Sequence, residues 1–407
     1  MNTIKGEYST AVIYTDIIED SAAEQIKLLC SQPFAKGSRI RIMPDVHAGK
    51  GCVIGFTADL GEMVIPNIVG VDIGCGMLTV ELGKLDIDFE QLDKAIRKYV
   101  PAGKNVHEGR IVRYPQLTEL HCYRHLNDAK RLERSIGTLG GGNHFIEIDI
   151  DDEGSKYLVI HTGSRNLGKQ VADYYQNLAH ELHCGRDVLY AMQAKLIAQY
   201  KAEGRKSEIQ AALKQLHKGF VAKECLIPRE LCYLTGEYRD MYLHDMGICQ
   251  EYARLNRVTI ASLIAEKALG RALSEFPYFE TVHNYIDLES NIVRKGAVSA
   301  KKGERLLIPI NMRDGSLICV GKGNPEWNCS APHGAGRLFS RTAAQERFTV
   351  EEFQQSMEGI YTTSVHKSTI DECPMAYKSM EDIVKNITPT AEIVKVIKPL
   401  YNFKAAD

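Results

Sequence analysis

The chain has 407 residues, of which 44% are hydrophobic and 25% charged, a composition typical of globular proteins that excludes wholesale disorder. Its formal net charge of −2 excludes a uniformly basic nucleic-acid-binding surface but leaves room for a local basic groove. No run of 18 apolar residues predicts a membrane-spanning helix, and residues 1–7 lack the apolar core of a signal peptide, so we expect a cytoplasmic protein.

Short apolar runs bounded by glycine or proline predict buried β-strands near both ends of the chain. The predicted strands are 40–43, 53–56, 63–69, 77–82, 145–150, 157–160, 306–310 and 317–320. The stretch from about 168 to 269 is rich in good helix formers and predicts helices, with an exposed helical hairpin at 191–223. Shorter helices are predicted at 20–31, 89–99, 336–346 and 380–386. Strands at both ends with a helical insertion between them favour an α+β fold.

Eleven cysteines are scattered along the chain without a CxxC pair, which argues against a zinc ribbon or a disulfide scaffold. We expect most of them to be buried thiols that pack as small apolar residues. The pairs His121/His125 and His180/His183 could share helix faces, but no carboxylate cluster accompanies them. We interpret both pairs as surface histidines.

The most unusual segment of the sequence is the glycine-punctuated turn 70–77, which follows an apolar run. It carries a carboxylate, Asp72, and a thiol, Cys75, three residues apart. Glycines let the backbone bend tightly and remove side chains that would block a ligand. Alone, the pair could be a capping Asp beside a buried Cys. Both are also metal ligands, and a thiolate can bridge two ions.

Four histidines sit at predicted strand ends or beside glycines, where ligands and catalytic groups concentrate. They are His144, His161, His283 and His333. One such histidine would be an ordinary structural residue, but four of them together with Asp72 and Cys75 predict a metal site. The ligand set suits two ions that share the thiolate, and Zn, Mn, Fe or Co could all occupy it.

Residues 163–170 resemble a phosphate-binding loop of the form G-x-x-x-x-G-K, but Gln170 replaces the Ser or Thr that holds Mg²⁺. We therefore interpret the motif as incomplete, although Arg165 at the helix start could bind phosphate. Cations between residues 94 and 113 are the best candidate for a patch that follows a nucleic-acid backbone.

Taken together, several segments resemble the RtcB family of RNA-splicing ligases, GTP-dependent enzymes that seal RNA. The matching segments, in family order, are 43–51, 70–77, 137–147, 161–168, 283–285, 294–299, 333–341 and 374–378. Both ends of the chain contribute to the match. The resemblance therefore implies one catalytic domain over residues 1–407, with mixed sheets around a central metal-containing cleft and a helical insertion at about 168–269.

The resemblance also assigns metal ligands. It implies that Cys75 bridges two Mn²⁺ ions, with Asp72 and His144 completing one site. His161 and His283 would complete the other. A metal that withdraws charge from phosphoryl oxygens makes a neutral imidazole a competent nucleophile toward a phosphate.

The nucleophile implied by the resemblance is His333, which would form a covalent histidine–GMP intermediate from GTP. GMP would then pass to an RNA 3′-phosphate, opened from a 2′,3′-cyclic phosphate, and a 5′-hydroxyl would displace it. The residues implied to line the guanosine nucleotide pocket are Asn143, Phe145, Glu147, Ser316, Gly334, Ala335, Gly336, Tyr377 and Lys404. An archease-type activator is the protein partner that the family implies.

Four cations flank these segments, and we expect them to clamp phosphates of the RNA ends. They are Arg165, Lys295, Arg337 and Arg341.

Two departures from the family pattern indicate a divergent paralogue. Residues 309–316 read PINMRDGS, where the family usually has PGSMGxxS, so nucleotide choice is one open feature. Ala331 and Pro332 precede His333, where small polar residues are common.

Two other functions compete with ligation: a dinuclear metallophosphoesterase that hydrolyses cyclic phosphates, and an RNA-end binding protein. Retention of His333 favours ligation, because neither alternative needs a nucleophilic histidine.

Overall fold

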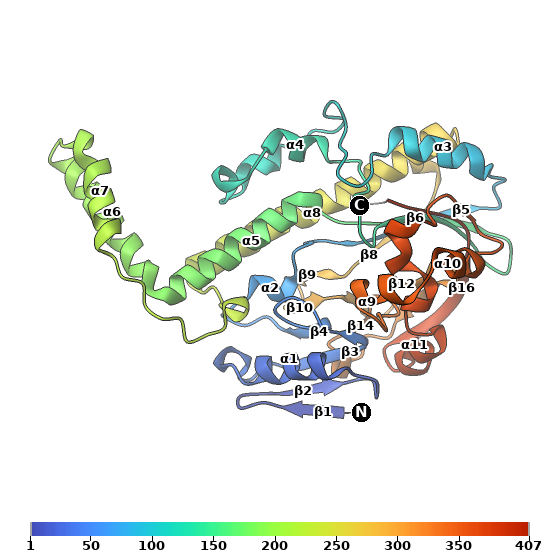
Figure 1. Cartoon of the computed structure of the whole chain (residues 1–407), viewed down its shortest axis with the longest axis horizontal. Helices are drawn as coiled ribbons and strands as arrows, with labels where there is room; N and C mark the ends of the chain where they lie inside the picture. The colour runs from blue at the N-terminus through green and yellow to red at the C-terminus, as the bar shows by residue number, and fades with distance from the viewer. Residues whose placement is uncertain (1, 406–407) are drawn as a thin grey trace.

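The computed structural model describes residues 2–405 and has an α+β fold (Figure 1). Within these residues the largest sheet has eight strands, in the order β12 (Arg305–Asn311), β13 (Gly315–Gly321), β16 (Ala391–Lys404), β6 (Phe145–Ile150), β7 (Lys156–Thr162), β5 (Gly76–Gly83) and β8 (Tyr278–Val282), with β15 (Tyr361–Thr362) beside β16. A six-stranded sheet has the order β1 (Asn2–Lys5), β2 (Thr10–Ile13), β3 (Ile40–His47), β4 (Ile54–Asp59), β10 (Ile292–Lys295) and β9 (Asn284–Asp287). A third sheet pairs β11 (Ala297–Ser299) with β14 (Ser330–Pro332).

Eleven α-helices accompany the sheets in the described part of the chain. They are α1 (Asp20–Cys30), α2 (Pro66–Val69), α3 (Phe89–Tyr99), α4 (Ala129–Arg134), α5 (Arg165–Glu181), α6 (Asp187–Ala202), α7 (Ile209–Gly219), α8 (Gly236–Ala268), α9 (Arg341–Arg347), α10 (Val350–Ser356) and α11 (Met380–Ile387). Among residues 2–405, no helix is long and apolar enough to cross a membrane.

Helices α3 and α8 pack together, and α8 also contacts strands β5 and β7 of the large sheet. The apolar stripe of α8 repeats at helical spacing, with Ile260 and Ile264 buried four residues apart. It meets inward-facing strand residues such as Leu78 and Ile146 in one core cluster. Each such buried aliphatic side chain contributes about 1.5–3 kcal/mol. This core fixes the strands whose ends carry the candidate site.

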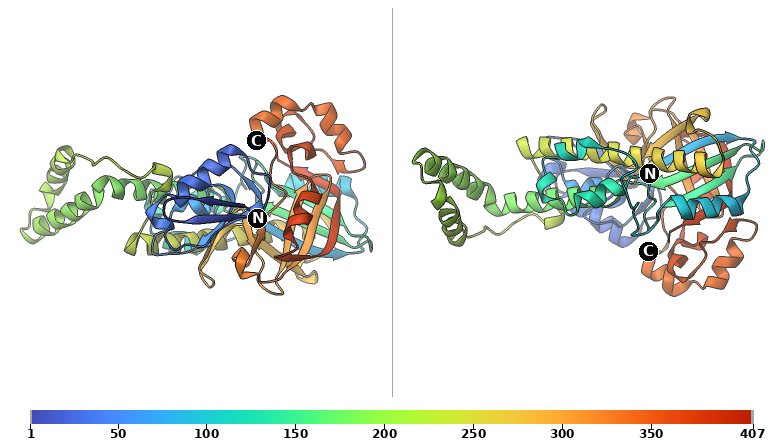
Figure 2. Two further views of the ribbon diagram at one scale, coloured as in Figure 1. Left: turned by 90° about the horizontal axis from the view of Figure 1, so that it is seen from below. Right: turned by 90° about the horizontal axis from the view of Figure 1, so that it is seen from above.

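Helices α6 and α7 form an arm that leaves the body of the molecule beyond the end of α5 (Figures 1 and 2). The predicted exposed hairpin at 191–223 corresponds to α6 and α7, in which Leu189 is the one fully buried residue. A π-helical turn at Leu182–Arg186 joins α5 to α6, and Gly185 adopts a φ of 81° there. The chain returns from α7 through residues 220–228 without a regular element.

Most predicted elements are confirmed within a few residues, including the helices at 20–31, 89–99 and 380–386. The strand predicted at 63–69 is wrong: Pro66 starts the short helix α2, because its fixed φ suits the first helical position. Only Val64 makes a bridge there, to Leu234. The helix predicted at 336–346 begins later, at Arg341.

Candidate active site

Strand register gathers the predicted ligands at one end of the large sheet. Cys75 directly precedes β5, His144 directly precedes β6, and His283 directly follows β8. These strands and β7 are antiparallel neighbours, with His161 of β7 paired to Phe145 of β6. The backbone N–H of His283 donates to the Cys75 carbonyl over 2.9 Å. Residues that are distant in sequence therefore converge because the sheet is ordered in this way.

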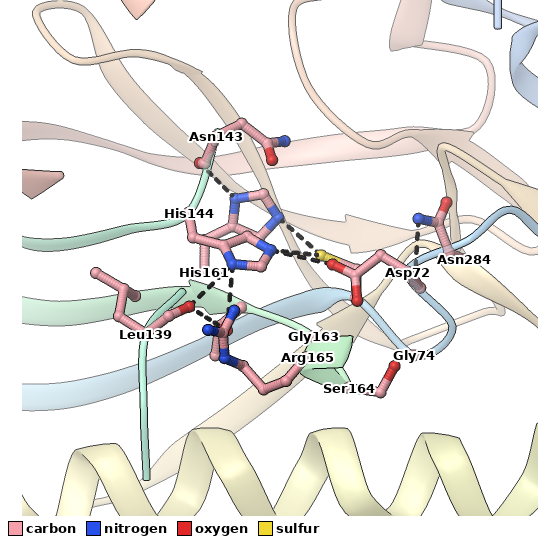
Figure 3. A network of polar contacts seen from close by, with 12 residues as sticks. Asp72, Gly74, Leu139, Asn143, His144, His161, Gly163, Ser164, Arg165 and Asn284 are labelled. Carbon is pink, nitrogen blue, oxygen red and sulfur yellow. Dashed lines mark hydrogen bonds and ion pairs between the residues drawn. The ribbon is translucent and has the colours of Figure 1, made fainter. Parts of the chain in front are cut away.

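The converging side chains form two sets that share one sulfur. Figure 3 shows Asp72, His144 and His161 around a sulfur atom. Asp72, Cys75 and His144 form one set, and Cys75, His161 and His283 form the other; within each set the ligand atoms lie within 4.8 Å of one another. Cys75 Sγ is 3.6 Å from His144 Nε2 and 3.4 Å from His161 Nε2. His161 Nε2 is 3.5 Å from His283 Nε2.

Backbone carbonyls orient two of the imidazoles. His144 Nδ1 lies 2.9 Å from the Leu139 carbonyl, and His161 Nδ1 lies 3.2 Å from the Asn143 carbonyl (Figure 3). A carbonyl can only accept, so each Nδ1 carries a proton, and each Nε2 faces the thiol. This is how histidine metal ligands are usually held.

Burial sets the charge of the ligand groups. It lowers the pKa of His161 and of His283 well below the usual histidine value, so both imidazoles are neutral. Burial, with the adjacent Asp72 carboxylate, raises the pKa of the Cys75 thiol. For Asp72, burial alone would raise the pKa, but the hydrogen bond and charge of His144 lower it.

The residues fit bound cations. Buried polar atoms without a partner inside the described structure include Asp72 Oδ1 and His283 Nδ1. Buried polar atoms normally have partners, so an unpaired carboxylate oxygen near the neutral imidazoles of His161 and His283 marks a place where positive charge is needed. One carboxylate, one shared thiol and three imidazoles suit borderline-soft divalent metals.

His333 lies directly beside this cluster, with its ring centroid 5.0 Å from that of His283. Its Nδ1 is 2.6 Å from Asp45 Oδ2, and its backbone N–H donates to the same oxygen over 3.0 Å. Asp45 is fully buried. The carboxylate accepts the Nδ1 proton, which leaves Nε2 as the free nitrogen, an orientation familiar from catalytic histidines.

Sequence reasoning did not single out Asp45, although the residue lies inside the matching segment 43–51. The available signal was a carboxylate that follows the apolar residues Ile42, Met43 and Pro44 of β3, and the structure buries Asp45 fully within that strand. Gly336 closes over the same strand: its φ is 75°, and a Cβ there would lie 2.5 Å from the Asp45 carbonyl oxygen. Glycine is therefore required at that position.

A cavity of about 230 Å³ opens next to His333. The residues predicted for the nucleotide pocket that line it are Asn143, Phe145, Glu147, Gly334, Ala335, Gly336, Tyr377 and Lys404. His161 and His283 line it as well, so the metal cluster and the cavity are continuous. The lining residues that the sequence analysis did not name for the pocket include His47, Met312 and Glu372.

Glu372 organises one wall of the cavity. It accepts from Lys404 Nζ and Tyr377 OH, both over 2.6 Å, and from Arg337 over 3.1 Å. Burial alone would raise the pKa of Glu372, but Lys404 and Arg337 lower it to about 2, so the carboxylate is ionised. On another wall, burial raises the pKa of Glu147 to about 7 against the opposing charge of Lys404.

Ser316 does not line the cavity. It is fully buried in β13, where it pairs with Pro309 and Ile397. The preceding turn is held by its own side chains: Asn311 Oδ1 accepts from the backbone N–H groups of Arg313 and Asp314. Asn311 and Met312 reach the cavity wall, whereas the Arg313 guanidinium pairs with Asp314.

The four predicted phosphate-binding cations divide into two pairs. Arg337 and Arg341 line the cavity, and the Arg341 side chain is 51% exposed. Arg165 instead donates to the Thr138 hydroxyl and the Gly103 carbonyl. Lys295 is buried, and its ammonium donates to the carbonyls of residues 50, 52 and 67. The last two cations have internal partners and stand outside the cavity lining.

Comparison with known proteins places this geometry in a family. A family model described as tRNA-splicing ligase RtcB matches residues 25–125 and 121–405. The chain is 31% identical to the RNA-splicing ligase RtcB of Escherichia coli strain K12, over 94% of this chain and 93% of that protein. It is 27% identical to the tRNA-splicing ligase RtcB of Archaeoglobus fulgidus, over 94% of this chain and 90% of that protein. The match spans nearly the whole chain and includes the strand ends that carry Cys75, His144, His161 and His283. The chain therefore belongs to the RtcB family.

Proposed function

We propose that this chain is a GTP-dependent RNA ligase that joins RNA 2′,3′-cyclic phosphate or 3′-phosphate ends to 5′-hydroxyl ends, in RNA repair or tRNA splicing. The observation that carries the proposal is His333, a histidine oriented by a buried carboxylate at the edge of a cavity that is continuous with a Cys/His/Asp cluster. The names of the curated relatives support the same activity.

The first step uses the free nitrogen of His333. Nε2 attacks the α-phosphorus of GTP, a P–N bond forms, the bond to pyrophosphate breaks, and GMP stays on the histidine. Asp45 accepts the hydrogen bond from Nδ1 throughout, so positive charge that develops on the ring is stabilised. A solvent-facing surface histidine would lack this arrangement.

The nucleotide would occupy the cavity that His333 borders. The backbone of Gly334–Gly336 would follow the phosphates, since glycine and alanine allow close approach there. Lys404 and Arg337, held by Glu372, would offer positive charge to the phosphates. Asn143, Phe145, Glu147 and Tyr377 would contact the remaining parts of the guanosine.

Two Mn²⁺ ions would be held by Asp72, Cys75, His144, His161 and His283, with Cys75 shared. When bound, they would stabilise the charge on the entering and leaving oxygens of phosphoryl transfer. The residues of this chain fix their place through strand register and through the carbonyls that hold Nδ1 of His144 and His161.

The later steps transfer GMP to RNA. Water opens a 2′,3′-cyclic phosphate, and an oxygen of the resulting 3′-phosphate attacks the phosphorus of the histidine–GMP. The P–N bond breaks and RNA-(3′)pp(5′)G forms. A 5′-hydroxyl oxygen then attacks the RNA phosphate, the new phosphodiester forms, and GMP leaves. Arg341 would hold phosphates of the RNA ends, since it is an exposed cation that lines the cavity.

Intact-mass measurement tests the proposal. The full chain is incubated with GTP and Mn²⁺, and the expected product carries one added GMP. It is then offered RNA with a 2′,3′-cyclic phosphate and RNA with a 5′-hydroxyl, and a joined product is expected. Opening of the cyclic phosphate without an adduct or joined RNA would instead identify a metallophosphoesterase. The same assay with and without an archease-type protein tests the proposed activator.

A further inference from the structure

A second group of sulfur and imidazole ligands lies at the base of the arm. His180 and Cys184 are four residues apart at the end of α5 and in the turn that follows it, so they share a helix face. Cys225 comes from the returning segment 220–228. The ligand atoms of these three residues lie within 4.8 Å of one another. None of the three lines the active-site cavity.

A further thiol lies beside Cys225, outside the group of three. Cys232 is fully buried, and its Sγ is 3.7 Å from Cys225 Sγ. A disulfide would require about 2.05 Å. Two thiolates on one tetrahedral zinc ion lie about 3.8 Å apart, given a Zn–S length of about 2.3 Å. The nearest approach of His180 to Cys184 is also 3.7 Å, from Nε2 to Sγ.

The neighbouring His183 is already engaged. Its Nε2 lies 3.1 Å from the Tyr233 carbonyl and 3.3 Å from the Tyr233 backbone nitrogen, and its ring packs on the Tyr233 ring. His180 makes no such backbone contact in the described structure and faces the sulfurs instead. The sequence interpretation of both as surface histidines is confirmed in part: both are partly exposed, but each also has a partner within the protein.

Few contacts hold the returning segment 220–228 to the end of α5. Residues 220–228 have no regular structure, and Val221 and Leu226 are 85% and 93% exposed, so this segment buries little apolar surface of its own. Its one backbone hydrogen bond to the α5 side joins the Lys223 N–H to the Cys184 carbonyl over 2.9 Å. The sulfurs sit at that contact point.

We propose that His180, Cys184, Cys225 and Cys232 bind one structural Zn²⁺ that fastens the returning segment of the arm to the end of α5. With Cys232 drawn in from its place beside Cys225, three thiolates and one imidazole would complete a tetrahedral zinc shell and leave no open position, as structural zinc sites require. Binding releases the three thiol protons to solvent. The site goes beyond the proposed ligase chemistry and shares no residue with it.

Two of the four sulfurs make weak hydrogen bonds to the backbone in this structure. In the protonated state the thiols of Cys225 and Cys232 donate to the Ile227 carbonyl. Zinc replaces these weak contacts with metal–sulfur bonds.

Metal content tests the proposal. In full-length protein carrying Cys75→Ser, which disables the active-site cluster, we expect one zinc per chain. Adding Cys184→Ser or Cys225→Ser should remove it, and Cys232→Ser should weaken its binding at least tenfold. The control is Cys329→Ser, a half-buried cysteine outside both groups, which should retain the zinc. Zinc that survives both Cys184→Ser and Cys225→Ser would overturn the proposal.

A second measurement needs no substitution of the proposed zinc ligands. Cobalt is added to chelator-treated Cys75→Ser protein, and the absorption should report three thiolates in a tetrahedral field. Trypsin should cut apo-protein after Lys218 and Lys223, and zinc should restore protection. A cobalt spectrum without thiolate bands, or cleavage that zinc leaves unchanged, would count against a zinc site. A Cys225–Cys232 disulfide in protein purified under reducing conditions would also exclude it.

Discussion

The active-site cluster and the group at the base of the arm use the same kinds of side chain in different settings. The first places one sulfur between two ligand sets, draws its residues from strand ends, and borders a cavity and His333. The second gathers three sulfurs and one imidazole from a helix and a loop, away from that cavity. In the two proposals, imidazole and thiol side chains serve catalysis beside a cavity and His333, and serve structure where the ligands enclose the ion.

The largest expected effect that separates the two regions comes from His333→Ala. The variant should fold, retain metal at the active site and form no GMP adduct, because the nucleophilic nitrogen is gone. Intact mass after incubation with GTP and Mn²⁺ is the measurement. His217→Ala, a histidine on the exposed helix α7, is the matched control and should form a normal adduct. An adduct of normal yield on His333→Ala would falsify the assignment.

Next in size is Cys75→Ser. It should lower occupancy at both active-site metal positions together, because one sulfur belongs to both ligand sets and a hydroxyl replaces a thiolate poorly. Metal analysis of the purified protein, with titration of Mn²⁺, gives the two occupancies. Cys30→Ser, a buried cysteine of α1, should leave both unchanged. Loss at one position alone would contradict a bridging role.

The sequence carried the identity of these ligands but not their arrangement. Asp72 and Cys75 stood out because a glycine turn surrounded them, and four histidines stood out beside glycines or at predicted strand ends. That they meet depends on the order of β6, β7, β5 and β8 in the sheet, which no local pattern encodes. The resemblance supplied that information.

Elements with mixed patterns were harder to predict. Strand β16 reads AEIVKVIKPLYNFK, with alternating exposure in its first half, Pro399 at a bulge and complete burial at its end. The proline and the change of pattern hide a strand that places Lys404 in the cavity. His180 and Cys225 are 45 residues apart, on either side of the arm, so their proximity is likewise invisible to spacing rules.

Asp45→Asn tests whether the nucleophile depends on orientation. An amide can donate to Nδ1, which would move the proton to Nε2 and remove the attacking lone pair. Adduct formation should slow by on the order of 100-fold, with metal content unchanged. The rate of GMP transfer is measured across pH, because a role confined to folding would lower yield without changing the pH profile. A wild-type rate and profile would exclude Asp45 as a positioning residue.

The two pairs of cations give a smaller contrast. Lys295→Met should lower the free energy of unfolding by about 1–3 kcal/mol, because three buried carbonyls lose their donor. Arg341→Ala should leave stability unchanged and weaken RNA joining by about 1–3 kcal/mol, while the histidine adduct still forms. Thermal unfolding and joining assays, repeated across salt concentrations, separate the two effects. Equal joining by Arg341→Ala and wild type at every salt concentration would remove Arg341 from the proposed RNA contacts.

The smallest expected effect concerns nucleotide choice at the turn after β12. Asn311 binds the turn backbone with its carbonyl oxygen, and Arg313 pairs with Asp314, so neither side chain is free to adopt the role of a specific base contact without rearrangement. Guanine preference would then rest on Asn143, Phe145, Glu147 and Met312, which line the cavity.

We expect GTP to outcompete ATP in adduct formation by a modest factor, about 10-fold for a difference of one hydrogen bond. Asn311→Ala should change the GTP-to-ATP ratio less than Glu147→Gln. The Glu147 carboxyl group is buried and lines the cavity, whereas the Asn311 side-chain oxygen accepts from the turn backbone, so Asn311→Ala should mainly loosen the turn. Competition between labelled GTP and ATP gives the ratio for each variant. Equal labelling from both nucleotides in the wild-type protein would show that the altered turn has removed base selectivity.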